Sequence, residues 1–313
     1  MELISKSHKK LIWSIVGGVA IVLIALMIIG SFWDLQIAEA FAVGERGFIY
    51  FGFGMGFEVL GFLPAILVNA CLFAALSVFV KKKWLKILFH VLVAMHLIGA
   101  VYCAIFWTLS NHDMGLRTAI AAPIFVTLGV ALSFPLIMLF KRIEPSKLKV
   151  LIYILVIGVI MGTIANAAAG IMQIFWGRYR FFEVSQNGLP FTQWFAPFGR
   201  SDAAAGHGAT SFPSLHASSV TSIIVLVMAG WALAIKKPLK ITFAVIAAVL
   251  LVCVPLSRMV LGWHYLTDVA FSLILGLVAF VIALLLADLV FGKKFKNFIN
   301  GNNKVASNKE EVK

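Results

Sequence analysis

Residues 149–172 read KVLIYILVIGVIMGTIANAAAGIM, and the only charged residue in this run is its first. A helix needs about 20 apolar residues to cross the hydrocarbon core of a bilayer. Runs of this kind recur along the 313-residue chain, which is 62% hydrophobic and 12% charged, whereas soluble domains carry about 25% charged residues. The composition excludes a water-soluble fold and predicts an all-α, polytopic integral membrane protein with about eight transmembrane helices. The predicted helices span residues 11–32, 58–80, 85–109, 118–140, 149–172, 214–235, 241–261 and 264–291.

The basic residues divide between the two faces of the predicted helices. Twenty of the 26 lie before the first helix, in alternate connections and in the C-terminal tail, and all but one of these are lysines. By the positive-inside rule, these connections and both termini are cytoplasmic, so the net charge of +13 reflects topology and not nucleic-acid binding. The other six are arginines, which suit phosphate or carboxylate. They fall in or beside the outward connections: Arg46, Arg117, Arg178, Arg180, Arg200 and Arg258.

The last outward connection carries a histidine and an aspartate beside an arginine. His264 and Asp268 are four residues apart, so on a helix they share one face. A carboxylate on one imidazole nitrogen fixes the tautomer and raises the nucleophilicity of the other nitrogen. Gly262 would break the preceding helix and bring Arg258 back toward His264. The alternative is a structural His–Asp pair beside an arginine that reaches the membrane interface.

The helix predicted at residues 214–235 carries a second histidine in its first turn. Ser214 follows Pro213 and suits the N-cap position. The free amides of Leu215 and His216 would then form an anion site at the helix start. His216 could donate a proton to a leaving group there. The alternative is an ordinary capped helix with an interfacial histidine.

The longest connection, at about residues 173–213, adds two cations. Arg178 and Arg180 flank Tyr179, and taken alone this pattern is also typical of headgroup anchoring. By the charge distribution, all three clusters reach the same outer face. Together they predict a phosphoryl-transfer site that uses no metal. Arginines and amides would hold the phosphate oxygens, one histidine would attack in line, and the other would protonate the departing oxygen.

The order and spacing of these clusters resemble the type 2 phosphatidic acid phosphatase (PAP2) superfamily, in particular its bacterial membrane lipid phosphatases. The family pattern is K-x6-R-P, then P-S-G-H, then S-R-x5-H-x3-D. The third motif is matched in full by Ser257, Arg258, His264 and Asp268. The second is matched by Pro213, Ser214 and His216, with Leu215 in place of glycine. The first is matched only by Arg180, with Gln173 in place of lysine and Phe181 in place of proline.

The resemblance implies a role for each matching residue. His264 would be the nucleophile that forms a phosphohistidine, Asp268 would orient it, and His216 would be the general acid. The phosphate would lie against Arg180, Ser214 and Arg258, and further against Arg178, Gln173 and Leu215. No metal or other cofactor is implied. A PAP2-like six-helix catalytic domain would cover residues 85–291. Residues 1–84 would add a cytoplasmic N-terminus and two further transmembrane helices, and residues 292–313 would form a polar cytoplasmic tail.

The residues and the resemblance together predict a multi-pass enzyme of the plasma membrane that hydrolyses a lipid phosphate or diphosphate monoester at the outer face. Candidate substrates are undecaprenyl diphosphate, phosphatidic acid, phosphatidylglycerol phosphate and lipid A phosphate. A lipid-to-lipid phosphotransferase is one alternative. A catalytically silent relative that binds or moves lipid phosphates is another, and it would accommodate Gln173 and Leu215. The oligomeric state is left open.

Overall fold

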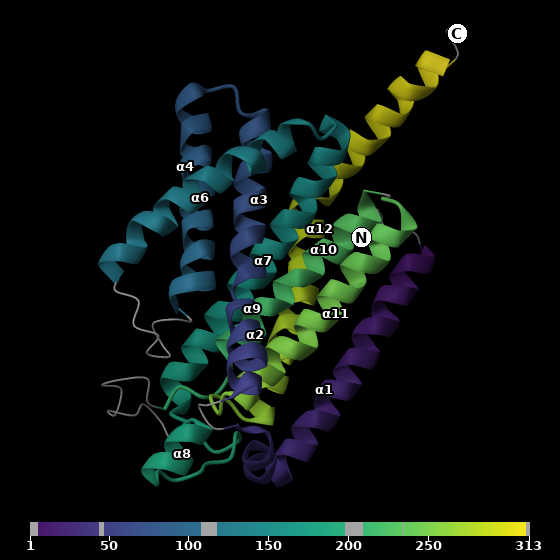
Figure 1. Ribbon diagram of the computed structural model, residues 1–313. Coiled ribbons are helices and arrows are strands. Elements are labelled where there is room, and N and C mark those ends of the chain that lie inside the picture. The colour runs from purple at the N-terminus through teal and green to yellow at the C-terminus, as the bar shows by residue number, and fades with distance from the viewer. Residues whose placement is uncertain (1–5, 44–46, 108–117, 198–208, 234, 311–313) are drawn as a thin grey trace.

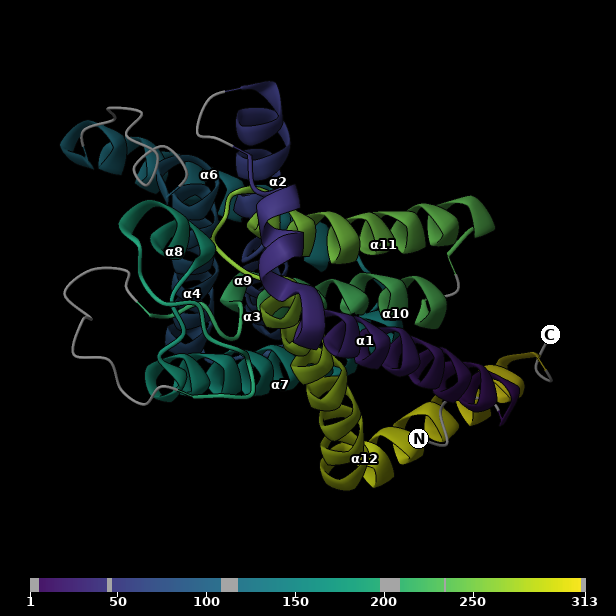
Figure 2. The same cartoon turned by 90° about the horizontal axis from the view of Figure 1, so that it is seen from below.

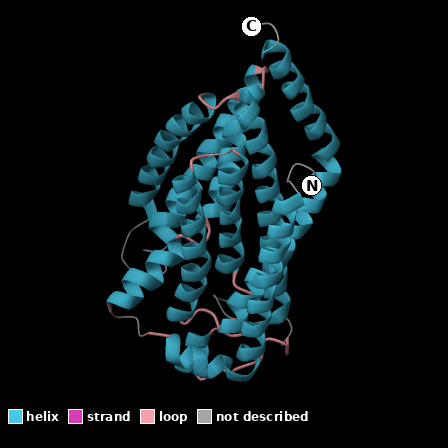
Figure 3. Ribbon diagram, turned by 90° about the vertical axis from the view of Figure 1, so that its right-hand side faces the viewer, coloured by secondary structure: helices cyan, strands magenta, loops and turns pink. Residues whose placement is uncertain are grey.

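The computed structural model describes residues 6–43, 47–107, 118–197, 209–233 and 235–310. These residues form helices and loops and contain no strand (Figure 3). Among them, eight helical spans are long and apolar enough to cross a membrane, which confirms the all-α, multi-pass prediction. The α-helices are α1 (Lys6–Phe41), α2 (Gly56–Val59), α3 (Leu63–Phe79), α4 (Lys83–Val101), α6 (Thr118–Lys141), α7 (Pro145–Trp176), α8 (Phe181–Asn187), α9 (Leu215–Val220), α10 (Ile224–Ala232), α11 (Lys237–Val260) and α12 (Leu266–Glu310). Shorter π-helical and 3₁₀ segments adjoin them at Ile49–Met55, Tyr102–Trp107 and Thr221–Ile223.

The long helices run side by side between two ends of a bundle (Figure 1). Helix α8 marks one end, and both chain termini lie toward the other. The connections from α3 to α4, from α6 to α7 and from α10 to α11 also lie at the end opposite α8. These connections carry many of the lysines. Successive connections therefore lie at alternate ends of the bundle, as the charge distribution predicted. The lysine-rich connections are at one end and the three motifs are at the other.

The first two membrane spans are longer than the sequence predicted, and each contains a buried carboxylate. The first span was expected to end at residue 32; the helix kinks at Trp33, where the backbone is not helical, and the span continues past Asp34 to Phe41. The second was expected to begin at Glu58, yet it begins at Ile49. Asp34 and Glu58 are only 1% and 2% exposed. A charged side chain that finds a partner inside the bundle does not have to leave the membrane, so neither residue ends its span.

One apolar core joins helices from both sides of the domain boundary predicted at residue 84. It packs Val68 of α3 with Leu97 of α4, Ile137 of α6, Leu155 of α7 and Val225 of α10. Helix α1 likewise contacts α12. The division into 1–84 and 85–291 stays a prediction, but residues of the first part are packed into the bundle. The backbone of residues 292–310, predicted as a tail, continues α12 as a helix that projects from the bundle (Figure 1).

Gly129→Ala is expected to destabilise the protein. A Cβ at Gly129 of α6 would lie 2.6 Å from the backbone N and Cα of Ile98 in α4, and backbone atoms cannot move aside cheaply. Overpacking of this kind costs about 1–3 kcal/mol. The matched control is Gly99→Ala in α4, where a Cβ meets no atom of the described residues within 4 Å. The measurement is the temperature at which the detergent-purified protein loses half of its monodisperse fraction. Equal temperatures for the two variants would contradict the close α4–α6 contact.

Candidate active site

Helix α9 begins at the end of the bundle that carries α8, and it buries His216 under the turn between α2 and α3. Ser214 is the N-cap, as predicted, and accepts a hydrogen bond from the amide of Ala217 at 3.5 Å. The rings of Phe62 and His216 lie 4.2 Å apart between centroids. A Cβ at Gly61 would lie 2.7 Å from His216 Cδ2, so only glycine leaves room for the imidazole here. Figure 2 shows the bundle from this end, with α9 near the middle of the view.

Helix α11 ends with a turn that brings its last arginine beside the following histidine. Gly262 has a left-handed φ of +71°, which suits a glycine after a helix end. The amides of Trp263 and His264 then both point at the carbonyl oxygen of Arg258, at 3.0 and 3.3 Å. The predicted break at Gly262 is confirmed, and it brings the backbones of Arg258 and His264 together.

Two guanidinium groups gather on one indole ring and keep unpaired donors. The Cζ atoms of Arg180 and Arg258 lie 4.4 and 5.4 Å from the ring centroid of Trp263. Within the part of the chain that the structure describes, four buried nitrogens here have no hydrogen-bond partner. They are Nε and Nη1 of Arg180, Nε of Arg258 and Nε2 of His216. Arg180, Arg258 and His264 all lie within electrostatic reach of His216. Because buried polar groups are normally paired, this cluster suits a phosphate, which would accept several such donors.

His264 is 3% exposed, and its hydrogen bonding leaves one ring nitrogen available. Nδ1 lies 2.6 Å from the carbonyl oxygen of Ser211. A carbonyl can only accept, so Nδ1 carries the hydrogen, and Nε2 of the neutral ring keeps a lone pair. Burial and the charges of Arg258 and Arg180 outweigh the opposing effect of Asp268 and lower the pKa of His264 to about 4. The ring is therefore neutral at ordinary pH, which is the form that can act as a nucleophile.

Asp268 orients His264 less directly than the sequence predicted. Helix α12 begins only at Leu266, so His264 precedes the helix and the two residues do not share a helical face. The distance from His264 Nδ1 to Asp268 Oδ2 is 3.6 Å, longer than a good hydrogen bond. Ser211 connects them, because its carbonyl faces His264 and its hydroxyl donates to Asp268 Oδ2. Asp268 also accepts from the amide of Tyr265 at 2.8 Å, which fixes the turn that carries His264.

Arg178 is held by protein groups, in contrast to its predicted place against the phosphate. Its Nε donates to the carbonyl of Thr192 at 2.9 Å. Its Nη1 donates to Thr267 Oγ1 at 2.8 Å and to Asp268 Oδ1, and its Nη2 donates to Asp34 Oδ2 at 2.8 Å. The side chain is 1% exposed. The sequence does not show that two carboxylates from distant helices converge on this guanidinium.

Two carboxylates of the site were missed by the sequence analysis. Asp34 of α1 pairs with Arg178, and Glu58 of α2 pairs with Arg258. An ionisable residue within an apolar run is a functional candidate, and that signal was available for both. It was overlooked because each residue lies at the edge of its predicted segment, where a charge would face water.

The remaining motif residues lie around the cluster. Gln173 Nε2 donates to the carbonyl of Pro213 at 2.7 Å, so it ties α7 to the start of α9. Leu215 is the first residue of α9. Arg180 is the N-cap of α8, and Phe181 takes the first helical position, where proline is also favoured. The predicted outward arginines Arg46, Arg117 and Arg200 lie outside the described residues.

Comparison with known families identifies one segment of the chain. Residues 150–290 match the model of the PAP2 superfamily. This segment belongs to the PAP2 superfamily. Membership in this superfamily indicates phosphatase-type activity on phosphate esters. A comparison with curated proteins found no match, and neither did one with solved structures.

The PAP2 match extends from α7 into α12 and contains all the motif residues from Gln173 to Asp268. The matched segment is shorter than the PAP2-like catalytic domain predicted from the sequence, which was expected to begin at residue 85. Asp34 and Glu58 lie before it, so one of the two carboxylates on Arg178 and the carboxylate on Arg258 come from helices outside the matched segment.

Arg178→Lys and Arg180→Lys are expected to separate a structural arginine from a phosphate-binding one. Lysine cannot reproduce the four bonds of Arg178, and breaking a buried ion pair costs about 3–5 kcal/mol, so Arg178→Lys should markedly lower the unfolding temperature. Arg180→Lys keeps the charge but loses the forked donors. It should leave stability nearly unchanged and weaken inhibition by orthophosphate about tenfold. Weaker orthophosphate inhibition with unchanged stability in Arg178→Lys would contradict the assignment of Arg178.

Proposed function

We propose that this PAP2 protein is a membrane lipid phosphatase that hydrolyses a lipid phosphate or diphosphate monoester through a phosphohistidine at His264. The observation that carries the proposal is the cluster of buried, unpaired nitrogens on Arg180, Arg258 and His216. A dianionic phosphate would satisfy these groups, and its phosphorus would then lie close to the available nitrogen of His264. The same cluster would stabilise the charge on the equatorial oxygens in the transition state.

The reaction would proceed in two steps. In the first, the lone pair of His264 Nε2 attacks phosphorus, the bond from phosphorus to the lipid oxygen breaks, and His216 gives its proton to that oxygen. In the second, His216 takes a proton from water, the water oxygen attacks phosphorus, and the bond from phosphorus to His264 breaks, which releases inorganic phosphate. The hydrogen bond from His264 Nδ1 to Ser211 would help to hold the imidazolium that forms during transfer.

A lipid substrate is supported by the surroundings of the site. The residues proposed to hold the phosphate stand at the ends of membrane-spanning helices, so a lipid tail could stay in the bilayer while its headgroup reaches His264. We further propose that the site faces the outside of the plasma membrane. The lysine-rich connections lie at the opposite end of the bundle, and such connections favour the cytoplasm.

A second candidate is a silent relative that binds or moves lipid phosphates. The observation that favours it is Gln173, which takes the place of a charged lysine in the family pattern. Its amide donates a hydrogen bond to the carbonyl of Pro213. Retained lipid binding without phosphate release, even in Gln173→Lys, would support this candidate and contradict the phosphatase.

His264→Gln and His216→Gln are expected to differ in their dependence on the leaving group. His264→Gln should lower phosphate release from any ester by at least about 10³-fold, because the nucleophile is lost. His216→Gln should lower release from an alkyl phosphate by about 10²–10⁴-fold, but release from p-nitrophenyl phosphate far less, because nitrophenolate departs without a proton. The measurement is phosphate release by the purified variants.

His96→Gln in α4 is a matched control, since His96 bonds the carbonyl of Leu92 in its own helix. The wild type and this control should also retain an acid-labile, base-stable label from a ³²P-labelled substrate, and His264→Gln should not. Full activity of His264→Gln would refute the mechanism.

The acid limb of the pH–rate profile is expected below the usual range for histidine. Attack requires neutral His264, and its pKa is lowered from 6.5 to about 4. Between these two values an ordinary histidine would be protonated, whereas His264 stays neutral and active. After correction for ionisation of the lipid phosphate, measured by ³¹P NMR, kcat/KM should be maintained at pH 5.5. A corrected limb centred near pH 6.5 would contradict the burial of His264.

A further inference from the structure

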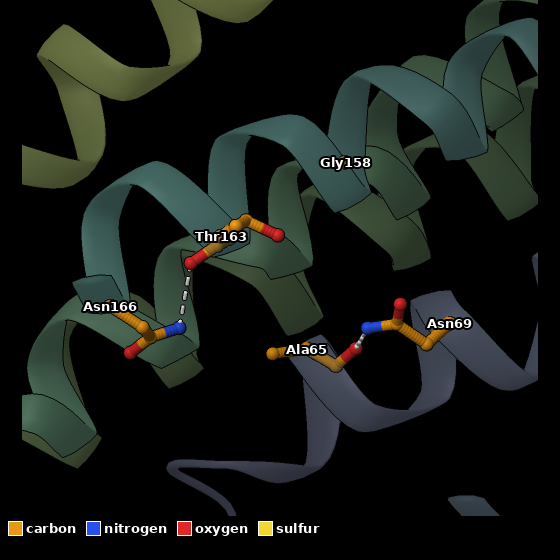
Figure 4. A pocket seen from close by; sticks show the side chains of 6 residues that line it. Ala65, Asn69, Gly158, Thr163 and Asn166 are labelled. Carbon is orange, nitrogen blue, oxygen red and sulfur yellow. Dashed lines mark hydrogen bonds between the residues drawn. The ribbon is translucent and has the colours of Figure 1, made fainter.

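A polar hollow of about 160 Å³ lies between α3 and α7, inside the membrane-spanning part of the bundle (Figure 4). Thr163 is exposed on the outside of α7, so the hollow opens toward the surrounding lipid. Polar groups within a membrane are costly and commonly mark a functional site. The lining residues are Ala65, Asn69, Gly158, Gly162, Thr163 and Asn166.

The two asparagines offer hydrogen-bond donors to the hollow. Asn69 Nδ2 donates to the carbonyl of Ala65 at 2.8 Å, and Asn166 Nδ2 donates to the carbonyl of Gly162 at 2.9 Å. Because a carbonyl can only accept, both amide orientations are fixed. Each NH₂ group has two hydrogens, so one on each side chain stays available. Figure 4 shows the two amide nitrogens on the sides of the asparagines that face each other. A ligand held between them must therefore present acceptors.

The hollow lies deeper in the bundle than the proposed phosphate site. Asn69 follows Phe62, which packs on His216, by seven residues, or about 10 Å along a helix. Asn166 Oδ1 accepts from the hydroxyls of Ser218 and Ser219, the second and third residues after His216. The hollow thus begins about one helical turn below His216. A glycerolipid whose phosphate reaches His216 carries its ester carbonyls at this depth, only a few bonds from phosphorus.

We propose that this hollow binds the ester carbonyl groups of a glycerolipid phosphate, with Asn69 and Asn166 as the donors. The inference rests on the proposed lipid phosphatase function and deepens it. A polyprenyl phosphate has only hydrocarbon below its phosphate, so it would leave both amides without a new acceptor. Asn69 and Asn166 are thus specificity-determining residues that favour ester-linked glycerolipids over polyprenyl lipids.

The test compares two phosphatidic acids of equal chain length in detergent micelles, one with ester-linked and one with ether-linked chains. The ether lipid keeps the phosphate and the tails but lacks the carbonyl oxygens. Wild-type kcat/KM should be about three- to tenfold higher for the diester, the factor expected for one or two net hydrogen bonds. Asn69→Leu should lower kcat/KM for the diester toward the diether value and leave the diether value unchanged. Since both lipids are measured on one preparation, partial unfolding lowers both values and does not change their ratio.

Ser77→Ala is the control on α3. The Ser77 hydroxyl bonds the carbonyl of Ala74 in its own helix and does not line the hollow, so this variant should keep the wild-type ratio. Equal wild-type kcat/KM values for the two lipids would overturn this inference but not the proposed phosphatase function. An unchanged diester-to-diether ratio in Asn69→Leu would do the same. An unchanged ratio with lower stability would mean that bilayer lipid occupies the hollow instead of substrate, which also overturns it. Phosphate release from neither lipid would contradict the proposed function, and with it this inference.

Discussion

A guanidinium held between two carboxylates is the interaction on which the rest of the site depends. Arg178 lies with Asp34 and Asp268 where all three side chains are almost inaccessible. Burying such charges costs several kcal/mol per ion, which is offset only when the hydrogen bonds are complete and well aligned. The bonds to Thr192 and Thr267 help to complete the set on Arg178. These hydrogen bonds tolerate little displacement of the three side chains. They therefore fix the relative positions of α1, the loop before α8 and the start of α12.

The geometry of His264 follows from that ion cluster. Asp268 accepts from Arg178 on one oxygen and from Ser211 and the amide of Tyr265 on the other. The first contact anchors the carboxylate, and the other two fix the loop and the turn on either side of the imidazole. His264 is therefore positioned through its neighbours, since its distance to Asp268 is longer than a direct hydrogen bond allows.

The site uses its arginines for different purposes. Arg178 is neutralised by two carboxylates and serves the structure. Arg258 is paired with Glu58 but keeps an unpaired Nε, and Arg180 keeps two unpaired nitrogens beside it. The proposed phosphate would therefore be met by Arg180 and Arg258. Because Asp34 and Glu58 belong to α1 and α2, the two helices outside the PAP2 match are part of the site's electrostatic balance and not a separate appendage.

The sequence alone determined the membrane class, the alternation of the connections, the cap at Ser214 and the break at Gly262. These features depend on local composition or on neighbours within one helical turn. Only the tertiary structure decided which charges pair. Asp34 and Arg178 are 144 residues apart, and Glu58 and Arg258 are 200 apart. A buried charge takes the partner that packing brings to it, and spacing along the chain does not encode that choice. For the same reason Arg178 resembled a phosphate ligand in the sequence, whereas in the folded protein it holds the frame around His264.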